Sequence, residues 1–168
     1  MGVEPHPPHV GRFTRRASYL VATRPGAWFF TKVGMRIDRR LMPATRGRLR
    51  MTMGMPSALL THKGAKSGAV RTTPLVYFTD GDDVVLVASN GGAPRHPAWL
   101  HNIRRHPEVE LSTDGRPEPY VAREAEGAER ERLWTAACGM YPGYAIYQRR
   151  AGERRIPVVV CSPRMPGR

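Results

Sequence analysis

The chain bends at His62-Lys63-Gly64-Ala65-Lys66-Ser67-Gly68-Ala69-Val70-Arg71-Thr72-Thr73-Pro74-Leu75, where a basic turn with two glycines separates two apolar runs. Gly64 and Gly68 allow positive φ angles and close approach of a ligand to the backbone. Lys66 and Arg71 bring positive charge, and Ser67 brings a hydroxyl beside backbone N–H groups. The pattern predicts either an anion-binding loop that holds a phosphate or a hairpin turn with solvated lysines.

Most of the net positive charge of the chain lies in residues 1–71, up to the end of this turn. At 168 residues the chain has the length of one domain, and its basic residues are 24 arginines and 3 lysines. Residues 1–71 hold 14 of them against Glu4 and Asp38, a net charge of +12, whereas residues 72–168 have a net charge of +1. This distribution favours an anionic partner, which could be a polyanionic cofactor, an acidic membrane face or nucleic acid.

Cysteine usage and hydropathy indicate a cytoplasmic protein. Cys138 and Cys161 lie in different predicted elements without metal-ligand spacing, so we expect neither a disulfide nor a zinc site. The sequence contains no apolar run near the roughly 20 residues that a membrane span requires, and no signal peptide. We expect the protein to be soluble or peripheral on the inner face of the cell membrane.

The N-terminal part divides into two predicted segments ahead of the main domain. Residues 1–24 are expected to form a mobile, basic segment. Residues 25–45 are expected to form an amphipathic helix, because Phe30, Val33 and Ile37 recur at helical spacing. This basic helix would either pack on the core of the domain or lie on an anionic membrane.

Residues 46–168 read as short strands separated by turn signals. The turns at 79–82 and 113–116 contain Asp-Gly pairs and predict antiparallel neighbours. Helices are expected over 97–105 and 128–140, the second continuing into a tyrosine-bearing segment. We predict a mainly β fold with helices (α+β), an antiparallel barrel of about seven strands. The expected strands are 48–53, 58–62, 70–78, 83–88, 109–112, 120–124 and 156–161.

A second candidate site follows one of these strands. Ala88-Ser89-Asn90-Gly91-Gly92-Ala93 leads towards Trp99 and Asn102, which are three residues apart and so share a face of a helix. The tryptophan would offer a flat apolar wall and the amide two hydrogen-bonding groups. The alternative is a glycine-rich turn with a core tryptophan.

A third candidate site is a row of tyrosines. Tyr141, Tyr144 and Tyr147 repeat every three residues and would line one face of a helix. Phenols at this spacing could stack on a planar ligand and donate hydrogen bonds to a carbonyl or nitro oxygen. The alternative is an aromatic face that caps the barrel.

Other arrangements of catalytic residues are absent from the sequence. It has no His-Glu-x-x-His motif, no G-x-S-x-G elbow and no G-x-G-x-x-G after a strand, and Ala65 replaces the second glycine of a Walker loop. His96, His101 and His106 are spaced five residues apart, which places them on divergent helical faces. We therefore expect surface histidines and no metal site.

Four parts of the sequence together resemble the deazaflavin-dependent nitroreductase family of actinobacterial split β-barrel oxidoreductases. They are the basic turn, the 88–102 segment, the three tyrosines and the terminal Arg154-Arg155-Ile156-Pro157-Val158-Val159-Val160-Cys161-Ser162-Pro163. The resemblance runs from about Arg46 to Pro163. It implies a split β-barrel that binds reduced coenzyme F420, an 8-hydroxy-5-deazaflavin with a phosphate and an oligoglutamate tail. It also implies hydride transfer to a menaquinone-like quinone or to a nitroaromatic or nitroimidazole acceptor.

The resemblance implies roles for individual residues. Ser89 would orient the electron acceptor, which the tyrosines Tyr141, Tyr144 and Tyr147 would face. Ala65 and Asn90 depart from residues common in the family, arginine and lysine, so the tail could bind less tightly. The implied cofactor contacts are Ala65, Lys66, Ser67, Gly68, Arg71, Pro74, Leu75, Val76, Ala88, Ser89, Asn90, Trp99 and Asn102.

Two alternatives stay open at this point. A flavin mononucleotide (FMN) enzyme on the same barrel would use the basic turn for its own phosphate. A nucleic-acid-binding module would explain the arginine-rich N-terminal part, but no recognised binding motif accompanies the charge, and we expect no nucleic-acid partner.

Overall fold

The computed structural model describes residues 3–7 and 55–164. The basic turn joins β1 (Ser57–Lys63) to β2 (Val70–Asp80), which pair antiparallel with Lys63 opposite Val70. β3 (Asp83–Val87) then returns along β2 after a tight turn in which Gly81 has a φ of +60°. The hairpin predicted at 79–82 is therefore confirmed.

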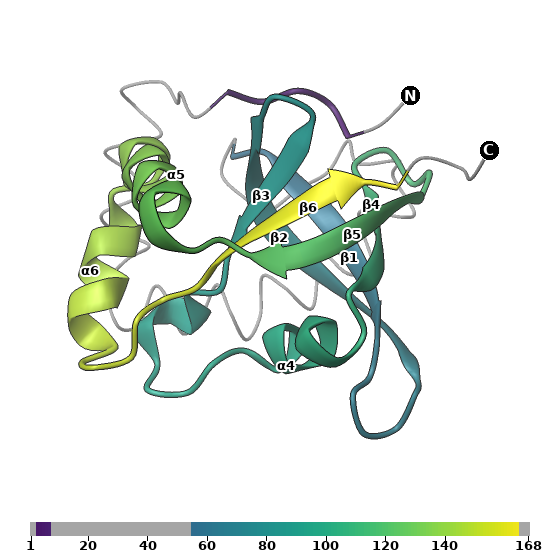
Figure 1. Cartoon of the computed structure of the whole chain (residues 1–168), viewed down its shortest axis with the longest axis horizontal. Coiled ribbons are helices and arrows are strands. Elements are labelled where there is room, and N and C mark those ends of the chain that lie inside the picture. The colour runs from purple at the N-terminus through teal and green to yellow at the C-terminus, as the bar shows by residue number, and fades with distance from the viewer. Residues whose placement is uncertain (1–2, 8–54, 165–168) are drawn as a thin grey trace.

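The strands close into an antiparallel barrel (Figure 1). β4 (Glu108–Ser112), β5 (Glu118–Glu124) and β6 (Val158–Pro163) complete it, in the order β1-β2-β3-β6-β5-β4. Six strands form the barrel within the described residues, each at one of the predicted positions. The expected strand at 48–53 and the expected helix at 25–45 lie outside the described residues, so membrane contact through that helix stays a prediction.

Three α-helices lie on the barrel within the described part of the chain: α4 (Ala98–Arg105), α5 (Gly127–Met140) and α6 (Gly143–Arg150). The helix expected over 128–140 matches α5, which ends at Met140, but Tyr141, expected to share a helical face with Tyr144 and Tyr147, lies outside both helices. Tyr141 has extended angles (φ −130°, ψ 93°), as expected for a residue before proline, and α6 starts afresh beyond Pro142. No described helix is long and apolar enough to cross a membrane.

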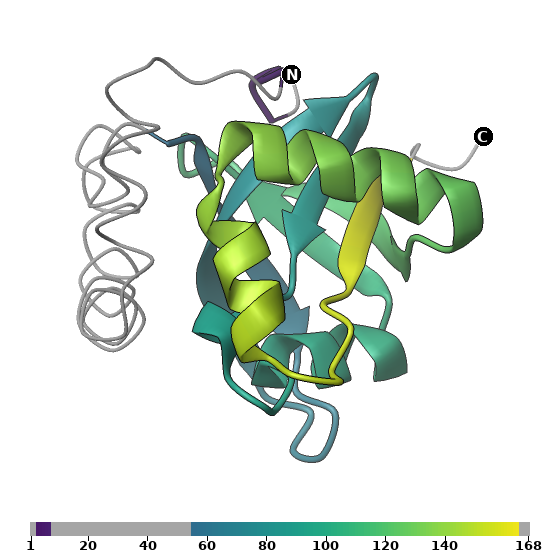
Figure 2. The same ribbon diagram turned by 90° about the vertical axis from the view of Figure 1, so that its left-hand side faces the viewer.

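The apolar side chains form two cores, one on each face of the sheet. All six strands send alternate residues into the barrel, where Leu60, Tyr77 and Leu86 are fully buried beside Leu100 of α4. The opposite faces of β2, β3 and β6 pack against α5 and α6. Figure 2 shows α6 running beside a short 3₁₀ turn, η2 (Asn90–Gly92), which directly follows β3.

The first described residues lie against the end of the barrel away from α4 (Figure 1). The Tyr77 hydroxyl, inside the barrel, donates to the carbonyl of Glu4 at 2.9 Å. The His6 and Thr79 backbones are also paired, with Thr79 N–H donating to the His6 carbonyl at 2.8 Å. Residues 3–7 thus contact β2 through Tyr77 and Thr79, and the expected mobility of residues 1–24 stays a prediction.

Candidate functional site

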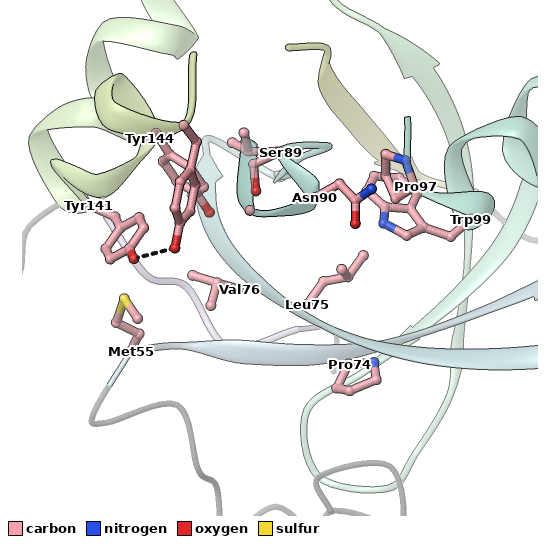
Figure 3. A pocket seen from close by; sticks show the side chains of 13 residues that line it. Met55, Pro74, Leu75, Val76, Ser89, Asn90, Pro97, Trp99, Tyr141 and Tyr144 are labelled. Atoms are coloured by element: carbon pink, nitrogen blue, oxygen red, sulfur yellow. Dashed lines mark hydrogen bonds between the residues drawn. The ribbon is translucent and has the colours of Figure 1, made fainter. Parts of the chain in front are cut away.

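A largely apolar pocket opens between β2, the 89–91 loop, α4 and α6 (Figure 3). Leu75 and Val76 of β2 lie along one side of it, Trp99 and Pro97 stand at one end, and the tyrosines stand at the other. None of its lining side chains carries a charge at neutral pH. The residues that line it are Met55, Pro74, Leu75, Val76, Val87, Ser89, Asn90, Gly91, Pro97, Trp99, Tyr141, Tyr144 and Tyr147.

The three tyrosines form one cluster at the end of the pocket. The Tyr141 and Tyr147 hydroxyls are hydrogen-bonded at 2.9 Å, and the Tyr141 and Tyr144 rings meet edge to face with centroids 5.0 Å apart. Tyr141 needs Gly143 beside it, because a Cβ at position 143 would overlap its ring. Burial raises the pKa of all three phenols, so each is a neutral hydrogen-bond donor at physiological pH.

Two hydroxyls in the pocket have no partner among the described residues. The Tyr144 side chain is 6% exposed, and neither its hydroxyl nor that of Ser89 bonds to another described group. Figure 3 shows Ser89 beside Tyr144, with Val76 below them. A ligand oxygen in the pocket could accept hydrogen bonds from both hydroxyls.

Two arginines from the C-terminal part hold the loop that carries Ser89. Arg154 donates to three carbonyls, those of Ala88 at 3.3 Å, Ser89 at 2.8 Å and Ala93 at 2.9 Å. Arg150 donates to the Gly91 carbonyl at 3.1 Å. The loop is therefore fixed by segments about 60 residues further along the chain.

The basic turn is a compact loop with outward-facing charges. Gly64 N–H donates to the Ala69 carbonyl at 2.9 Å, and Gly68 has a φ of +66°. Lys66, Ser67 and Arg71 are exposed, and within the described residues the N–H groups of Lys66 and Ser67 donate to no protein atom. Free N–H groups beside fixed positive charge form an anion-binding site.

Asn102 joins the basic turn to the pocket. Its Oδ1 accepts the Ala65 N–H at 2.9 Å, and its Nδ2 donates to His62 Nδ1 at 3.1 Å. Trp99, one turn earlier on α4, forms a wall of the pocket. The two predicted site segments therefore meet at α4.

The residues predicted from the sequence divide between these parts. Pro74, Leu75, Val76, Ser89, Asn90, Trp99 and the three tyrosines line the pocket, whereas Ala65, Lys66, Ser67, Gly68 and Arg71 lie on the adjoining turn. Two predictions need correction in detail. Ala88 is completely buried, so its side chain cannot reach a ligand, and both polar atoms of the Asn102 side chain already bond to protein.

Other residues of the site were not predicted. Met55, Val87 and Pro97 are apolar neighbours of predicted segments and carry no polar signal, and Gly91 lies inside the quoted 88–93 segment. Arg150 and Arg154 act on carbonyls of a distant loop, which no local pattern reveals. Among the described residues, no group of three or more metal-binding side chains could hold a metal ion.

A closed antiparallel barrel with a largely apolar pocket beside a basic turn, together with the family match, places the chain in the class of split β-barrel oxidoreductases. The family model for "F420H(2)-dependent quinone reductase" matches residues 34–163. The chain belongs to this family of enzymes, as its resemblance to the deazaflavin-dependent family indicated.

Individual relatives agree with this assignment. The chain is 36% identical over 145 residues to an F420H(2)-dependent quinone reductase of Mycobacterium tuberculosis, a match that covers 82% of this chain and 97% of that one. A solved structure of an F420-H2-dependent reductase is 41% identical, with a TM-score of 0.58, covering 64% of this chain and 94% of that chain. A second solved chain, described as a domain-swapped dimer, is 34% identical with a TM-score of 0.60, covering 76% of this chain and 98% of that chain.

Proposed function

We propose that the protein binds reduced coenzyme F420 and catalyses hydride transfer from it to a quinone. The observation that supports this most directly is the hydrogen bond from Ala65 N–H to Asn102 Oδ1, because it links the anion-binding turn to the helix that carries Trp99. One ligand can therefore place a charged tail on the turn and a planar ring in the pocket. An apolar pocket without a charge beside an exposed basic turn fits a cofactor of that shape.

The basic turn would hold the anionic part of the cofactor. Lys66, Ser67 and Arg71 lie at the exposed tip and base of the hairpin, where they can contact a phosphate and carboxylates. Gly64 makes the turn compact, since a Cβ there would lie 2.8 Å from Ser67 Oγ. With alanine rather than arginine at position 65, this chain would make fewer charged contacts with the tail.

The pocket would orient the acceptor and exclude water. When bound, the reduced deazaflavin supplies a hydride, and a quinone that gains a hydride and a proton becomes a quinol. The strand segment Pro74–Val76 would support the cofactor ring, with Trp99 and Asn90 at its edge. Ser89 and Tyr144 would donate hydrogen bonds to the acceptor oxygen on which negative charge develops.

The test is the double variant Ser89→Ala with Tyr144→Phe. Its quinone turnover should fall about a hundredfold, because a donor aimed at developing charge in a dry site contributes about that factor. Binding of the deazaflavin should change little, and Ser162→Ala on β6 is the matched control. Unchanged quinone turnover in the double variant would refute the polar roles of these two residues.

The cofactor itself can be distinguished by titration and colour. The purified protein should bind reduced deazaflavin, and its Lys66→Ala and Arg71→Ala variants should bind it less tightly. A bound yellow flavin that absorbs near about 450 nm would instead support the FMN alternative. Turnover of a nitroaromatic compound, measured in the same assay, tests whether the acceptor range extends beyond quinones.

A further inference from the structure

His62 is a buried histidine that the proposed reaction does not use. It lies on β1, is 3% exposed, and contacts two partners. Its Nε2 is 3.2 Å from Thr73 Oγ1 on β2, and its Nδ1 is 3.1 Å from Asn102 Nδ2 on α4. The ring therefore connects the two strands of the basic hairpin to the helix behind it.

The proton positions in this chain of contacts follow from one fixed donor. The Ala65 N–H can only donate, so the amide oxygen of Asn102 must face it. The amide nitrogen of Asn102 then faces His62, and since that nitrogen only donates, His62 Nδ1 must be an unprotonated acceptor. The ring proton of neutral His62 consequently lies on Nε2, where it can be donated to Thr73.

The surroundings of His62 favour this neutral form. Burial, and next the positive charge of Arg71, hold the pKa of His62 below its ordinary value. A hollow beside His62 also contains the side chains of Glu108 and Glu110 of β4. The charged or titratable groups that line it are Lys63, Glu108, Glu110, Tyr120 and Arg164.

We propose that neutral His62 is a positioning residue for cofactor binding: it orients the Asn102 amide, and Asn102 in turn holds Ala65 and the shape of the basic turn. The proposal rests on the proposed function for its link to the cofactor. It goes further by naming a residue outside the ligand contacts that controls the anion-binding loop. His62 is not one of the residues that line the pocket, and unlike the tip of the turn it is buried.

Protonation of His62 would break the contact. A proton on Nδ1 would face the amide hydrogens of Asn102, so the amide would have to rotate and Ala65 N–H would lose its acceptor. Because the folded pKa lies below the ordinary value of 6.5, the contact is intact at neutral pH and is lost as the pH falls through the folded pKa. The loop should therefore loosen in acid even without a ligand.

The first experiment measures the turn in the ligand-free protein. His62→Asn keeps an acceptor at the position of Nδ1 but does not titrate, whereas His62→Leu removes the acceptor. His101→Asn, an exposed histidine on the same helix as Asn102, is the control. The readouts are the protection of the Ala65 amide against hydrogen exchange and the nitrogen shifts of the His62 ring by NMR.

The expected pattern separates orientation from simple packing. Ala65 protection should fall about tenfold in His62→Leu at neutral pH and stay near wild type in His62→Asn, because one hydrogen bond contributes about that factor. On acidification wild type should lose this protection, and His62→Asn should keep it. Equal protection in wild type and His62→Leu would overturn the proposal, as would a ring proton on Nδ1. Should His62→Leu fail to fold, the comparison of wild type with His62→Asn on acidification still decides: equal loss of Ala65 protection in both would overturn the proposal.

The second experiment measures binding of the deazaflavin at neutral pH by fluorescence titration. The dissociation constant should rise about five- to tenfold in His62→Leu and little in His62→Asn or His101→Asn. Equal affinity of His62→Leu and wild type would overturn the link to the cofactor. If wild type does not bind the deazaflavin, the proposed function fails and this link fails with it, whereas the exchange of Ala65 still decides whether His62 orients the turn.

Discussion

The close contact between Gly92 and α6 offers a sharp test of how the pocket is built. Gly92 ends the η2 turn with a φ of +78°, and a Cβ there would lie 2.8 Å from the Tyr147 carbonyl oxygen and 3.0 Å from the Tyr147 Cα. These are backbone atoms of a helix and cannot move aside as a flexible side chain would. Gly92→Ala must therefore push the loop that carries Ser89 away from the tyrosines.

The cost of this substitution has two parts. Alanine in the left-handed region costs about 1 kcal/mol of folding free energy, and this part arises wherever φ is positive. Ordinary contact begins at 3.4 Å, so the new Cβ must move by about half an ångström, which adds about 1–3 kcal/mol in a packed interior. We expect Gly92→Ala to lower the free energy of unfolding by about 3 kcal/mol in total.

Gly81→Ala is the matched control, because Gly81 also has a positive φ (+60°) but a Cβ there would meet nothing within 4 Å. The control should lose only the backbone part, about 1 kcal/mol, with quinone turnover unchanged. Denaturant unfolding and steady-state kinetics compare the two variants. Gly92→Ala should also lower kcat/KM about tenfold, since the donor on Ser89 is misplaced. Equal stability and turnover in the two variants would refute the argument that loop and helix define the pocket together.

Three further outcomes follow from other contacts. Arg154→Gln should lower the free energy of unfolding by about 2 kcal/mol and reduce quinone turnover, because three loop carbonyls lose their donor. Arg155→Gln breaks only a surface ion pair with Glu131 and should lower the free energy of unfolding by under about 1 kcal/mol; urea unfolding of both variants measures this difference. Deletion of residues 1–7 should lower stability by about 1–2 kcal/mol, since Tyr77 loses its acceptor, and an unchanged unfolding midpoint would contradict this. In alkaline titration followed by tyrosinate absorbance, Tyr141 and Tyr144 should stay protonated above about pH 10 until the chain unfolds, and stability should fall there because their phenols ionise only in the unfolded chain.

Much of the barrel could be predicted because each strand carries its own signal. Alternating apolar residues and the Asp-Gly turns place β2, β3, β4 and β5 to within a few residues, and a closed barrel of short antiparallel strands follows. The end of α5 at Met140 was predicted, but the tyrosine repeat predicted one helical face across Pro142, where Tyr141 is not helical. A regular repeat of side chains is weaker evidence than the steric restriction that proline imposes on the residue before it.

The sequence predicted many of the side chains that line the pocket, but not the side chains that bind the backbone around it. The pocket tyrosines, Trp99 and Ser89 stand out as aromatic and hydroxyl groups beside glycines. The spacing of Trp99 and Asn102 correctly predicted a shared helix, but spacing cannot tell that both polar atoms of the Asn102 amide bond to Ala65 and His62. Arg154 was equally hidden, because the carbonyls it binds belong to a loop more than 60 residues earlier.

The placement of charge explains how one small domain can bind a polyanion and still carry out hydride transfer. Hydride transfer to a quinone needs oriented reactants, exclusion of water and neutral hydrogen-bond donors rather than an ionised acid or base. The charged groups accordingly lie on the exposed turn, where binding a phosphate leaves them in contact with water, while the pocket lining is uncharged. α4 separates the two regions and connects them, since Trp99 contacts one and Asn102 the other. The turn and the pocket wall are therefore joined through a single helix.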